Sequence, residues 1–369
     1  MELIDVELRR IRLPLVTPFR TSFGVETERD VLLVRVTTPD AQGWGECVAG
    51  SEPLYSSEHV DGAQLVAREH LLPRLFAVGD LAAAGVAGAL APVKGHQMAK
   101  AALEMAVLDA ELRAAGVSFG AHLGAVREAV DCGVSVGIFP TIPEMLDQVA
   151  GYLAAGYKRV KLKIEPGWDV APLRAVRERF GDDLLLQVDA NTAYTLADAP
   201  HLALLDDLGL LLIEQPLAED DIPGHAELAK VVKTPICLDE SIVSARSAEY
   251  AIAIGACSII NIKAGRVGGY LEARRAHDVC VERRVPVWCG GMLETGIGRA
   301  ANVALAALPG FTLPGDTSAS DRYFDRDITE PFVLHEGMLS VPTAPGLGVA
   351  VDLEYLDAIT DSVEVIGPA

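Results

Sequence analysis

RVKLKI (residues 159–164) begins a series of five short apolar runs that continues with LLLQVDAN (184–191), LLLIEQP (210–216), PICLDES (235–241) and IINIKAG (259–265). Each run carries a charged residue near its end. These residues are Lys163, Asp189, Glu214, Asp239 and Lys263, and they follow one another at intervals of 24 to 26 residues. Such an interval accommodates one buried strand and one covering helix. The spacing therefore predicts a repeating β/α architecture with a parallel sheet.

Three further runs extend this pattern: VSVGI (134–138) precedes the series, and PVWCGG (286–291) and FTLPGD (311–316) follow it. Eight runs that alternate with helical segments predict an α/β fold, a TIM-like (β/α) barrel of seven or eight strands. An open, doubly wound sheet would give a similar alternation. The barrel is the interpretation that we favour.

The chain before these runs has a different pattern, which predicts a separate α+β domain. Residues 2–14 and 31–38 resemble strands, and residues 95–115 have the periodicity of a helix. FRTSFG (19–24) and GSEPLYSS (50–57) are rich in Gly, Pro and Ser, and we expect them to form lid loops. We expect an N-terminal α+β capping domain over 1–125, the catalytic barrel over 126–321, and a C-terminal segment, 322–369, that packs back on the capping domain.

Composition excludes several classes of protein. The 369 residues, 50% of them hydrophobic, are enough for two domains with a well-buried core. The first residues mix charges with apolar positions, unlike a secretion signal, and no run reaches the roughly 18 apolar residues of a membrane span. The formal charge of -21 argues against nucleic acid or a membrane as partner. The six cysteines form no C-x-x-C pair, and we expect a cytoplasmic protein with reduced thiols.

Acidic residues at the ends of buried strands are costly unless they are paired or bind a ligand. Asp189, Glu214 and Asp239 end three consecutive runs, so their carboxylates should meet at the C-terminal rim of the barrel. Each acid alone could instead cap a helix or pair with a base. Three carboxylates together form an oxygen cage suited to Mg²⁺. We therefore expect Mg²⁺ as the cofactor, with Mn²⁺ or Co²⁺ as substitutes.

Two lysines on one run suggest a catalytic base. Lys161 and Lys163 are two positions apart, so on a strand their side chains leave the same face about 7 Å apart. A solvated strand face is one interpretation. If the face is inward, each ammonium lowers the pKa of the other. With 134–138 as the first strand, Lys163 lies on the second strand and Lys263 on the sixth, which are opposite in an eight-stranded barrel.

This arrangement suits the removal of the proton α to a carboxylate. The proton is weakly acidic because its loss gives an enediolate with a second negative charge, which a divalent cation and an opposing ammonium stabilise. Two bases on opposite faces permit racemisation. A leaving group on the β-carbon permits dehydration from the same intermediate. We expect the substrate to be a small-molecule carboxylate.

The same residues resemble the muconate-lactonising-enzyme subgroup of the enolase superfamily. More closely, nine motifs are similar to the o-succinylbenzoate synthase / N-succinylamino acid racemase family, also called N-acylamino acid racemases. They are FRTSFG, GWGE, KLKIEPGWDV, VDANTAYTL, IEQPL, CLDES, NIKAGRVGG, WCGGMLETGIGRA and LPGDTSAS. The resemblance covers the whole chain.

The resemblance implies a role for each matching residue. The metal ligands would be Asp189, Glu214 and Asp239, and the acid/base pair would be Lys163 and Lys263. Lys161 would contact the substrate carboxylate, with Ser135 and Asn191 in the same pocket. The acyl or succinyl part would lie against Phe23, Gly291, Met292, Leu293 and the loop near Pro53. A homo-oligomer is also implied.

Two reactions follow from the resemblance: dehydration by an o-succinylbenzoate synthase, which would serve menaquinone biosynthesis, and racemisation by an N-acylamino acid racemase. One active site can perform both. Dipeptide epimerase or cycloisomerase activity within the same superfamily remains an alternative. A non-catalytic barrel that binds a metal or an anion is the alternative from another class of protein.

Overall fold

The computed structural model of the protein describes residues 1–368 and contains a seven-stranded parallel sheet in the order β11-β10-β9-β8-β7-β6-β5. The predicted α/β class, with a barrel-like parallel sheet and an N-terminal capping domain, is confirmed. The strands are β5 (Gly133–Val136), β6 (Arg159–Lys163), β7 (Leu185–Asp189), β8 (Ile213–Glu214), β9 (Ile236–Leu238), β10 (Ile259–Ile262) and β11 (Val287–Cys289). Apart from Leu185, every residue of these strands is buried, which explains why the runs are apolar on both faces.

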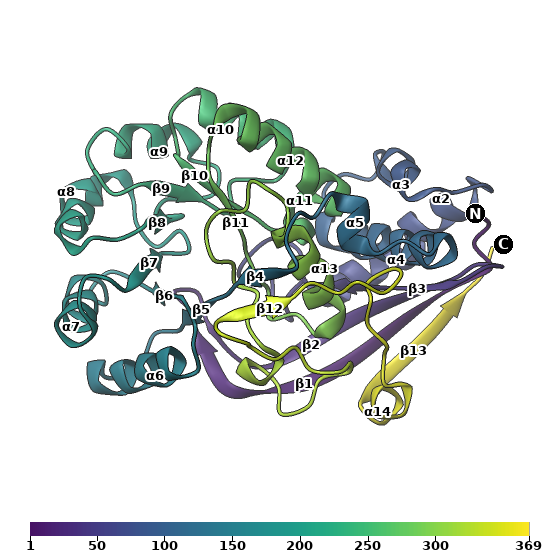
Figure 1. The fold of residues 1–369 in the computed structure, drawn as a ribbon. Coiled ribbons are helices and arrows are strands. Elements are labelled where there is room, and N and C mark those ends of the chain that lie inside the picture. The colour runs from purple at the N-terminus through teal and green to yellow at the C-terminus, as the bar shows by residue number, and fades with distance from the viewer. Residues whose placement is uncertain (369) are drawn as a thin grey trace.

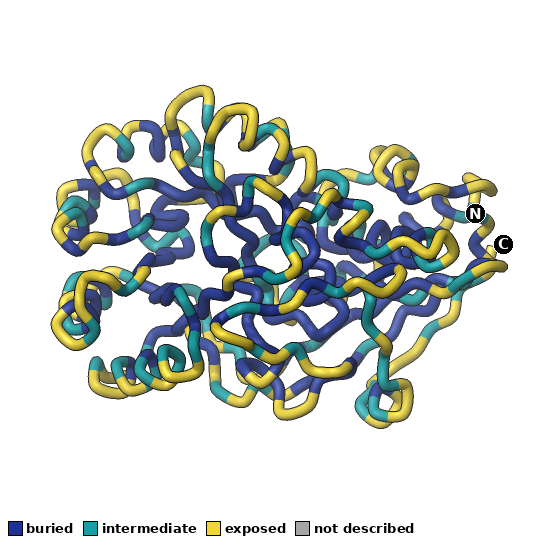
Figure 2. Tube along the Cα trace, in the orientation of Figure 1, coloured by how far each residue is buried: buried dark blue, intermediate teal, exposed yellow. Residues whose placement is uncertain are grey.

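Helices follow the strands and cover the outside of the sheet (Figure 1). They are α6 (Ile142–Ala154), α7 (Val170–Phe180), α8 (Ala199–Leu202), α9 (Ile222–Leu228), α10 (Ala245–Ala253), α11 (Ala264–Val267), α12 (Tyr270–Arg283) and α13 (Gly296–Ala306), with short 3-10 turns at Leu196–Asp198, Ala203–Leu208 and Ser320–Arg322. Helix α6 buries Met145 and Val149 and exposes its other face. Figure 2 shows this general arrangement, with buried strands inside and exposed outer surfaces on the helices.

The eighth apolar run, residues 311–316, does not form the strand that the pattern predicts. The cause is local. Pro314 has no amide hydrogen to donate to a strand ladder, and the glycine that follows it, Gly315, weakens a strand further. The run makes isolated parallel bridges instead, from Phe311 to Val287 and from Gly315 to Cys132. Because Gly133 N donates to Gly315 O at 2.7 Å, and Asp316 N donates to Cys289 O at 2.8 Å, the segment joins β5 to β11 and closes the ring.

A second, antiparallel sheet forms the N-terminal part of the molecule. Its order is β13-β1-β2-β3, and its strands are β1 (Asp5–Arg20), β2 (Val25–Thr37), β3 (Gln42–Cys47) and β13 (Thr360–Ile366). Strand β13 pairs with β1 from Val6 to Ile11, so the end of the chain lies in the N-terminal sheet. The two chain ends accordingly lie at the same corner of the molecule in Figure 1.

Helix α4 packs on β3 at very close range. The glycines of the GWGE motif permit this approach, because a Cβ added at Gly43 would lie 2.1 Å from Ala106 O and one at Gly45 would lie 2.0 Å from Ala102 O. The small residues of α4 complete the fit. The N-terminal helices are α1 (Val60–Val66), a π-helical turn (Ala67–Leu71), α2 (Leu72–Phe76), α3 (Ala83–Leu90), α4 (Gln97–Ala115) and α5 (Phe119–Leu123).

The remaining elements connect the two parts. They are the pair β4 (Ala129–Asp131) and β12 (Met338–Ser340), and α14 (Leu353–Ala358). Within residues 1–368, no helix combines the length and the apolar character that a membrane crossing requires. The six cysteines are all buried and free of disulfide bonds, as the sequence predicts.

Candidate active site

Five charged residues stand side by side at the C-terminal ends of β6 to β10. Lys163 pairs with Asp189 across β6 and β7, and Asp189 pairs with Glu214 across β7 and β8. Asp239 and Lys263 follow directly after β9 and β10. The row therefore runs Lys, Asp, Glu, Asp, Lys along the sheet. All five side chains are buried, and the three carboxylates are no more than 1% exposed.

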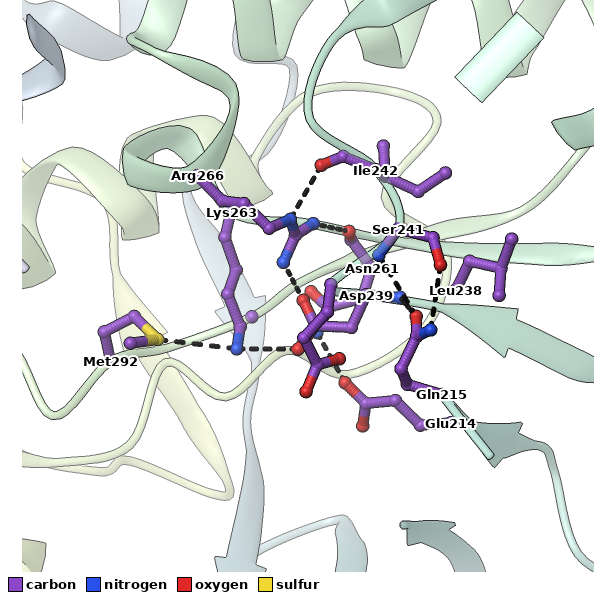
Figure 3. A network of polar contacts seen from close by, with 12 residues as sticks. Glu214, Gln215, Leu238, Asp239, Ser241, Ile242, Asn261, Lys263, Arg266 and Met292 are labelled. Atoms are coloured by element: carbon purple, nitrogen blue, oxygen red, sulfur yellow. Dashed lines mark hydrogen bonds and ion pairs between the residues drawn. The ribbon is translucent and has the colours of Figure 1, made fainter. Parts of the chain in front are cut away.

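Each outer lysine contacts its own aspartate. Lys163 Nζ lies 2.6 Å from Asp189 Oδ2, and Lys263 Nζ lies 2.8 Å from Asp239 Oδ2. Figure 3 shows the second half of this row, with the Lys263 ammonium pointing toward Asp239 and Glu214 below Asp239 in the view. The two amines thus lie at opposite ends of the row, with Glu214 at its centre.

Lys161 lies among the acids. Its Nζ is 2.7 Å from Asp316 Oδ2, 3.1 Å from Glu214 Oε2 and 3.3 Å from Asp189 Oδ2. The ammonium also lies 4.7 Å from the ring centre of Trp288. The ammonium of Lys161 therefore lies among three carboxylates in this structure.

The pKa values of the three lysines move in different directions. Burial, with a smaller contribution from Lys161, lowers the pKa of Lys163. Burial also disfavours the charged form of Lys161, but the charges of Asp316, Glu214 and Asp189 outweigh it and raise the pKa. Tyr55 and Glu240 likewise outweigh burial at Lys263 and raise its pKa. The prediction of a lowered pKa for both lysines is therefore wrong for Lys161, because the charges of Asp316, Glu214 and Asp189 together outweigh burial.

The pKa values of the carboxylates also move in different directions. Lys163 and Lys161 hold the pKa of Asp189 well below its usual range despite burial. Burial, reinforced by the charge of Asp189, raises the pKa of Glu214 and raises that of Glu240 to about 7. The site therefore combines acids that stay ionised with acids that hold a proton more readily.

The donor set of Asp189, Glu214 and Asp239 fits a hard divalent cation. The carboxylates are buried and adjacent, and Lys161 acts as a stand-in cation between two of them. Within residues 1–368, however, no three Asp, Glu, His or Cys side chains converge closely enough to hold an ion in this conformation. The reason is that each carboxylate is turned toward a cationic side chain. Their role as metal ligands is accordingly a proposal.

The residues predicted to bind substrate lie in two places around this row. Ser135 is the strand partner of Lys161, and its buried hydroxyl has no hydrogen-bond partner among the described residues. Asn191 Oδ1 accepts from Lys163 Nζ at 2.6 Å. Both predicted positions therefore adjoin the two lysines of β6.

The predicted acyl-binding residues lie nearer to Lys263. Met292 Sδ is 3.5 Å from Lys263 Nζ, with Gly291 and Leu293 on either side of it in the chain. The ring of Phe23 lies 6.2 Å from that of Tyr55, whose hydroxyl is 3.0 Å from Lys263 Nζ. The two predicted lid loops therefore contact each other, and the second of them reaches Lys263.

The sequence did not single out several residues of the site. They are Tyr55, Asp316, Glu240, Arg266 and Asn261. Asp316 ends the eighth apolar run, so the signal that found the other acids was present there too. Arg266 forms an ion pair with Asp239, and Asn261 Nδ2 donates to Glu214 Oε1 at 2.7 Å. No periodic signal marks Tyr55, which a loop carries into the site.

The backbone is strained at the ends of β7 and β8. Asn191, Thr192 and Gln215 have φ angles of 41°, 66° and 37°, in the left-handed region that glycine favours. Thr192 is β-branched, so this conformation is particularly costly for it. Such strain persists only where the surrounding structure imposes it. The three residues closely follow Asp189 and Glu214 in the chain, so the strain lies at the candidate site.

Comparisons with known proteins show the family to which the chain is similar. A family model described as mandelate racemase / muconate lactonizing enzyme, N-terminal domain, matches residues 3–124, and one described as enolase C-terminal domain-like matches residues 144–356. An N-succinylamino acid racemase from Amycolatopsis sp is 68% identical over 367 residues, which is 100% of each chain. An o-succinylbenzoate synthase from Geobacillus kaustophilus is 49% identical over 96% of this chain and 95% of that protein.

Solved structures share the fold over the full length. The crystal structure of an enolase superfamily member from Listeria innocua Clip11262 matches with a TM-score of 0.95 and 41% identity. The match covers 100% of this chain and 99% of that one.

Proposed function

Because this chain belongs to the mandelate racemase / muconate lactonizing enzyme family of the enolase superfamily, we propose that it racemises N-succinylamino acids by removing and returning the α-proton. The observation that carries the proposal is the row of charges in which an amine stands at each end of three carboxylates. A two-base racemisation requires an acid/base group on each side of the α-carbon, which these two amines would supply.

We assign Lys163 as the base and Lys263 as the acid for one enantiomer, with the roles exchanged for the other. Burial favours the neutral amine of Lys163, which can accept the α-proton. The negative surroundings of Lys263 favour the ammonium, which can donate a proton to the opposite face. Lys161 supplies a fixed positive charge for the substrate carboxylate. A divalent cation bound by Asp189, Glu214 and Asp239 would stabilise the second negative charge that develops on that carboxylate.

The first test is isotope exchange in D₂O, with each enantiomer of an N-succinylamino acid supplied separately. We expect the wild-type enzyme to place deuterium at the α-carbon of both enantiomers. Lys163→Ala and Lys263→Ala should each lower racemisation at least about 1,000-fold, and each variant should retain exchange for one enantiomer only. Lys233→Ala, an exposed lysine, is the control. Exchange of both enantiomers by either active-site variant would refute the two-base assignment.

A second reaction at the same site is the dehydration that forms o-succinylbenzoate. The 49% identity to a synthase over almost the whole chain favours it. Dehydration starts with the same proton removal, so the β-hydroxy carboxylate precursor should inhibit racemisation competitively. Comparing kcat/KM for this precursor with that for N-succinyl, N-acetyl and dipeptide substrates identifies the main activity. A menaquinone-related role depends on the dehydration being efficient.

We also propose the remaining expectations from the sequence. These are Mg²⁺ as the cofactor, the roles of Ser135, Asn191, Phe23 and residues 291–293 in substrate binding, a homo-oligomeric assembly in the cytoplasm, and the domain boundaries at 125 and 321. The pairing of β13 with β1 supports the assignment of the C-terminal segment to the capping domain. Light scattering of the purified protein measures the assembly directly.

A further inference from the structure

Gln215 is an uncharged residue next to Glu214, the middle residue of the row of charges. It follows Glu214 at the end of β8 and is completely buried. Its φ of 37° places a residue with a long side chain in the left-handed region. A strained, buried polar residue at this position is expected to contribute interactions that outweigh the strain.

The backbone of Gln215 connects the segments on both sides of it. Its amide donates to Cys237 O at 2.9 Å, on β9. Its carbonyl accepts from Thr192 N at 2.8 Å, in the segment that follows β7. Thr192 adjoins Asn191, which accepts from Lys163. One residue therefore links the strand ends that carry Asp189 and Asp239.

The side chain of Gln215 makes four hydrogen bonds, which is its full capacity. Its Oε1 accepts from Asp239 N at 3.0 Å and from Ser241 N at 3.3 Å. Its Nε2 donates to Ser241 Oγ at 2.8 Å and to Leu217 O at 3.1 Å. Figure 3 shows the Gln215 side chain extending from the Glu214 segment toward Asp239 and Ser241.

We propose that Gln215 is the positioning residue that sets the separation of Asp189, Glu214 and Asp239, and thereby the affinity of the site for a divalent cation. The inference rests on the proposed metal site and is independent of the substrate. An amide is needed because two backbone N–H groups face Oε1 and a carbonyl faces Nε2. A glutamate would place an oxygen against Leu217 O.

The test is calorimetric titration of the metal-free enzyme with Mg²⁺. Removing groups that orient metal ligands typically weakens metal binding 10- to 100-fold. We therefore expect Gln215→Ala to raise the Kd for Mg²⁺ at least about 10-fold, with a smaller increase for Gln215→Glu, which retains the oxygen that accepts from Asp239 N. Melting temperatures are measured on the same samples.

A glycine variant separates positioning from a general loss of stability. Gln215→Gly removes the same side chain but relieves the left-handed backbone, so it should be more stable than Gln215→Ala. We expect its Kd for Mg²⁺ to be raised as much as that of Gln215→Ala. Arg284→Gly, at an exposed residue with φ 58° far along the chain, is the matched control for relief of the backbone and should bind Mg²⁺ like the wild type.

The outcomes are distinguishable. A Kd within about threefold of wild type for Gln215→Ala, or recovery of wild-type affinity in Gln215→Gly, would overturn the role of Gln215. If the wild-type enzyme itself does not bind Mg²⁺, the proposed metal site falls and the role of Gln215 falls with it. Racemisation with no metal requirement would give that second result independently.

Discussion

Lys161 and Lys163 are separated by one residue of β6, yet their surroundings move their pKa values in opposite directions. Both are buried, so burial cannot explain the difference. Lys161 contacts three carboxylates, whereas Lys163 contacts Asp189 and the neutral Asn191. The number of neighbouring acids therefore decides in which direction the pKa of each of these two lysines moves.

Tyr55 offers a test of Lys263, the proposed proton donor at the other end of the row. Its hydroxyl is 3.0 Å from Lys263 Nζ and 3.2 Å from Asp239 Oδ2, and its ring centre is 4.5 Å from the same ammonium. Tyr55→Phe keeps the ring but removes a hydrogen bond to a charged group. We expect kcat for racemisation to fall about 10-fold with a small change in KM.

The control for this variant is Tyr194→Phe, which removes a buried hydroxyl that donates to Asp169 at 2.9 Å, outside the catalytic row. Steady-state kinetics in both directions measure the effect. If the two variants lose the same activity, the effect belongs to general stability and Tyr55 has no particular role at Lys263.

The sequence predicted the site residues that recur once per strand and helix of the barrel. It did not predict the residues that only the packing of the folded chain brings to the site. Lys163, Asp189, Glu214, Asp239 and Lys263 recur at a regular interval, and the structure places them side by side. Tyr55 and Arg266 lie outside that period, in a loop and a short helix. The contacts of Tyr55 depend on how the capping domain docks, and those of Arg266 depend on how α11 packs against the neighbouring strands, which no local pattern encodes. The pKa of Lys161 could not be predicted either, because Asp316 lies 155 residues further along the chain.

At the scale of elements, strand β3 and helix α13 are joined by a single buried side chain. Glu46, in the GWGE motif of β3, accepts from Thr295 N at 3.0 Å, Thr295 Oγ1 at 2.7 Å and Gly298 N at 2.9 Å. It therefore supplies acceptors for the free amides at the start of α13. The residues just before α13 include Met292, so this contact also links the capping sheet to the predicted acyl-binding segment.

Glu46 makes stability depend on pH. Burial, despite the hydrogen bond from Thr295, raises its pKa to about 7, whereas the unfolded value is about 4.5. Between these values the folded state holds a proton that the unfolded state has lost. The stability contributed by the protonated form is therefore fully present below pH 4.5 and is lost as pH rises through 7, by about 3 kcal/mol.

Glu46→Gln should remove this part of the pH dependence. Urea unfolding between pH 4.5 and 8 should show a flatter profile for the variant than for the wild type, although the variant is less stable overall because its amide cannot accept from every donor. Glu2→Gln, at an exposed residue, should leave the profile unchanged. Parallel profiles for wild type and Glu46→Gln would contradict the assignment.

The elements themselves were predictable to different degrees. Seven apolar runs became strands because both of their faces are covered, which continuous hydrophobic sequence indicates. The run at 311–316 did not, although it is equally apolar at its start, because Pro314 and Gly315 prevent a regular ladder. A pattern of hydrophobicity alone does not distinguish these cases, but the position of the proline does.

At the scale of the molecule, a cation bound by the buried acids would affect stability as well as the proposed catalysis, because the chain carries a net charge of -21. Three buried carboxylates meet at one rim, so a cation that binds them should favour the folded state. A ligand at 100 times its Kd stabilises a protein by about 2.7 kcal/mol. We expect saturating Mg²⁺ to raise the melting temperature by several degrees and a chelator to reverse the change.

Asp239→Asn is the variant that tests this claim. It preserves the size of the side chain but removes one of the three negative charges, so the increase in melting temperature with Mg²⁺ should largely disappear, together with metal-dependent turnover. Differential scanning fluorimetry with and without Mg²⁺ measures the first effect. An equal increase in the variant and the wild type would show that the cation binds elsewhere.

The pairing of β13 with β1 has a consequence for how the protein is made. A ribosome releases β1 near the start of synthesis and β13 only after the whole barrel has been translated. During elongation the outer edge of β1 consequently has no partner strand, and unpaired edges attract other chains. The capping sheet therefore cannot be completed until the last strand has been translated.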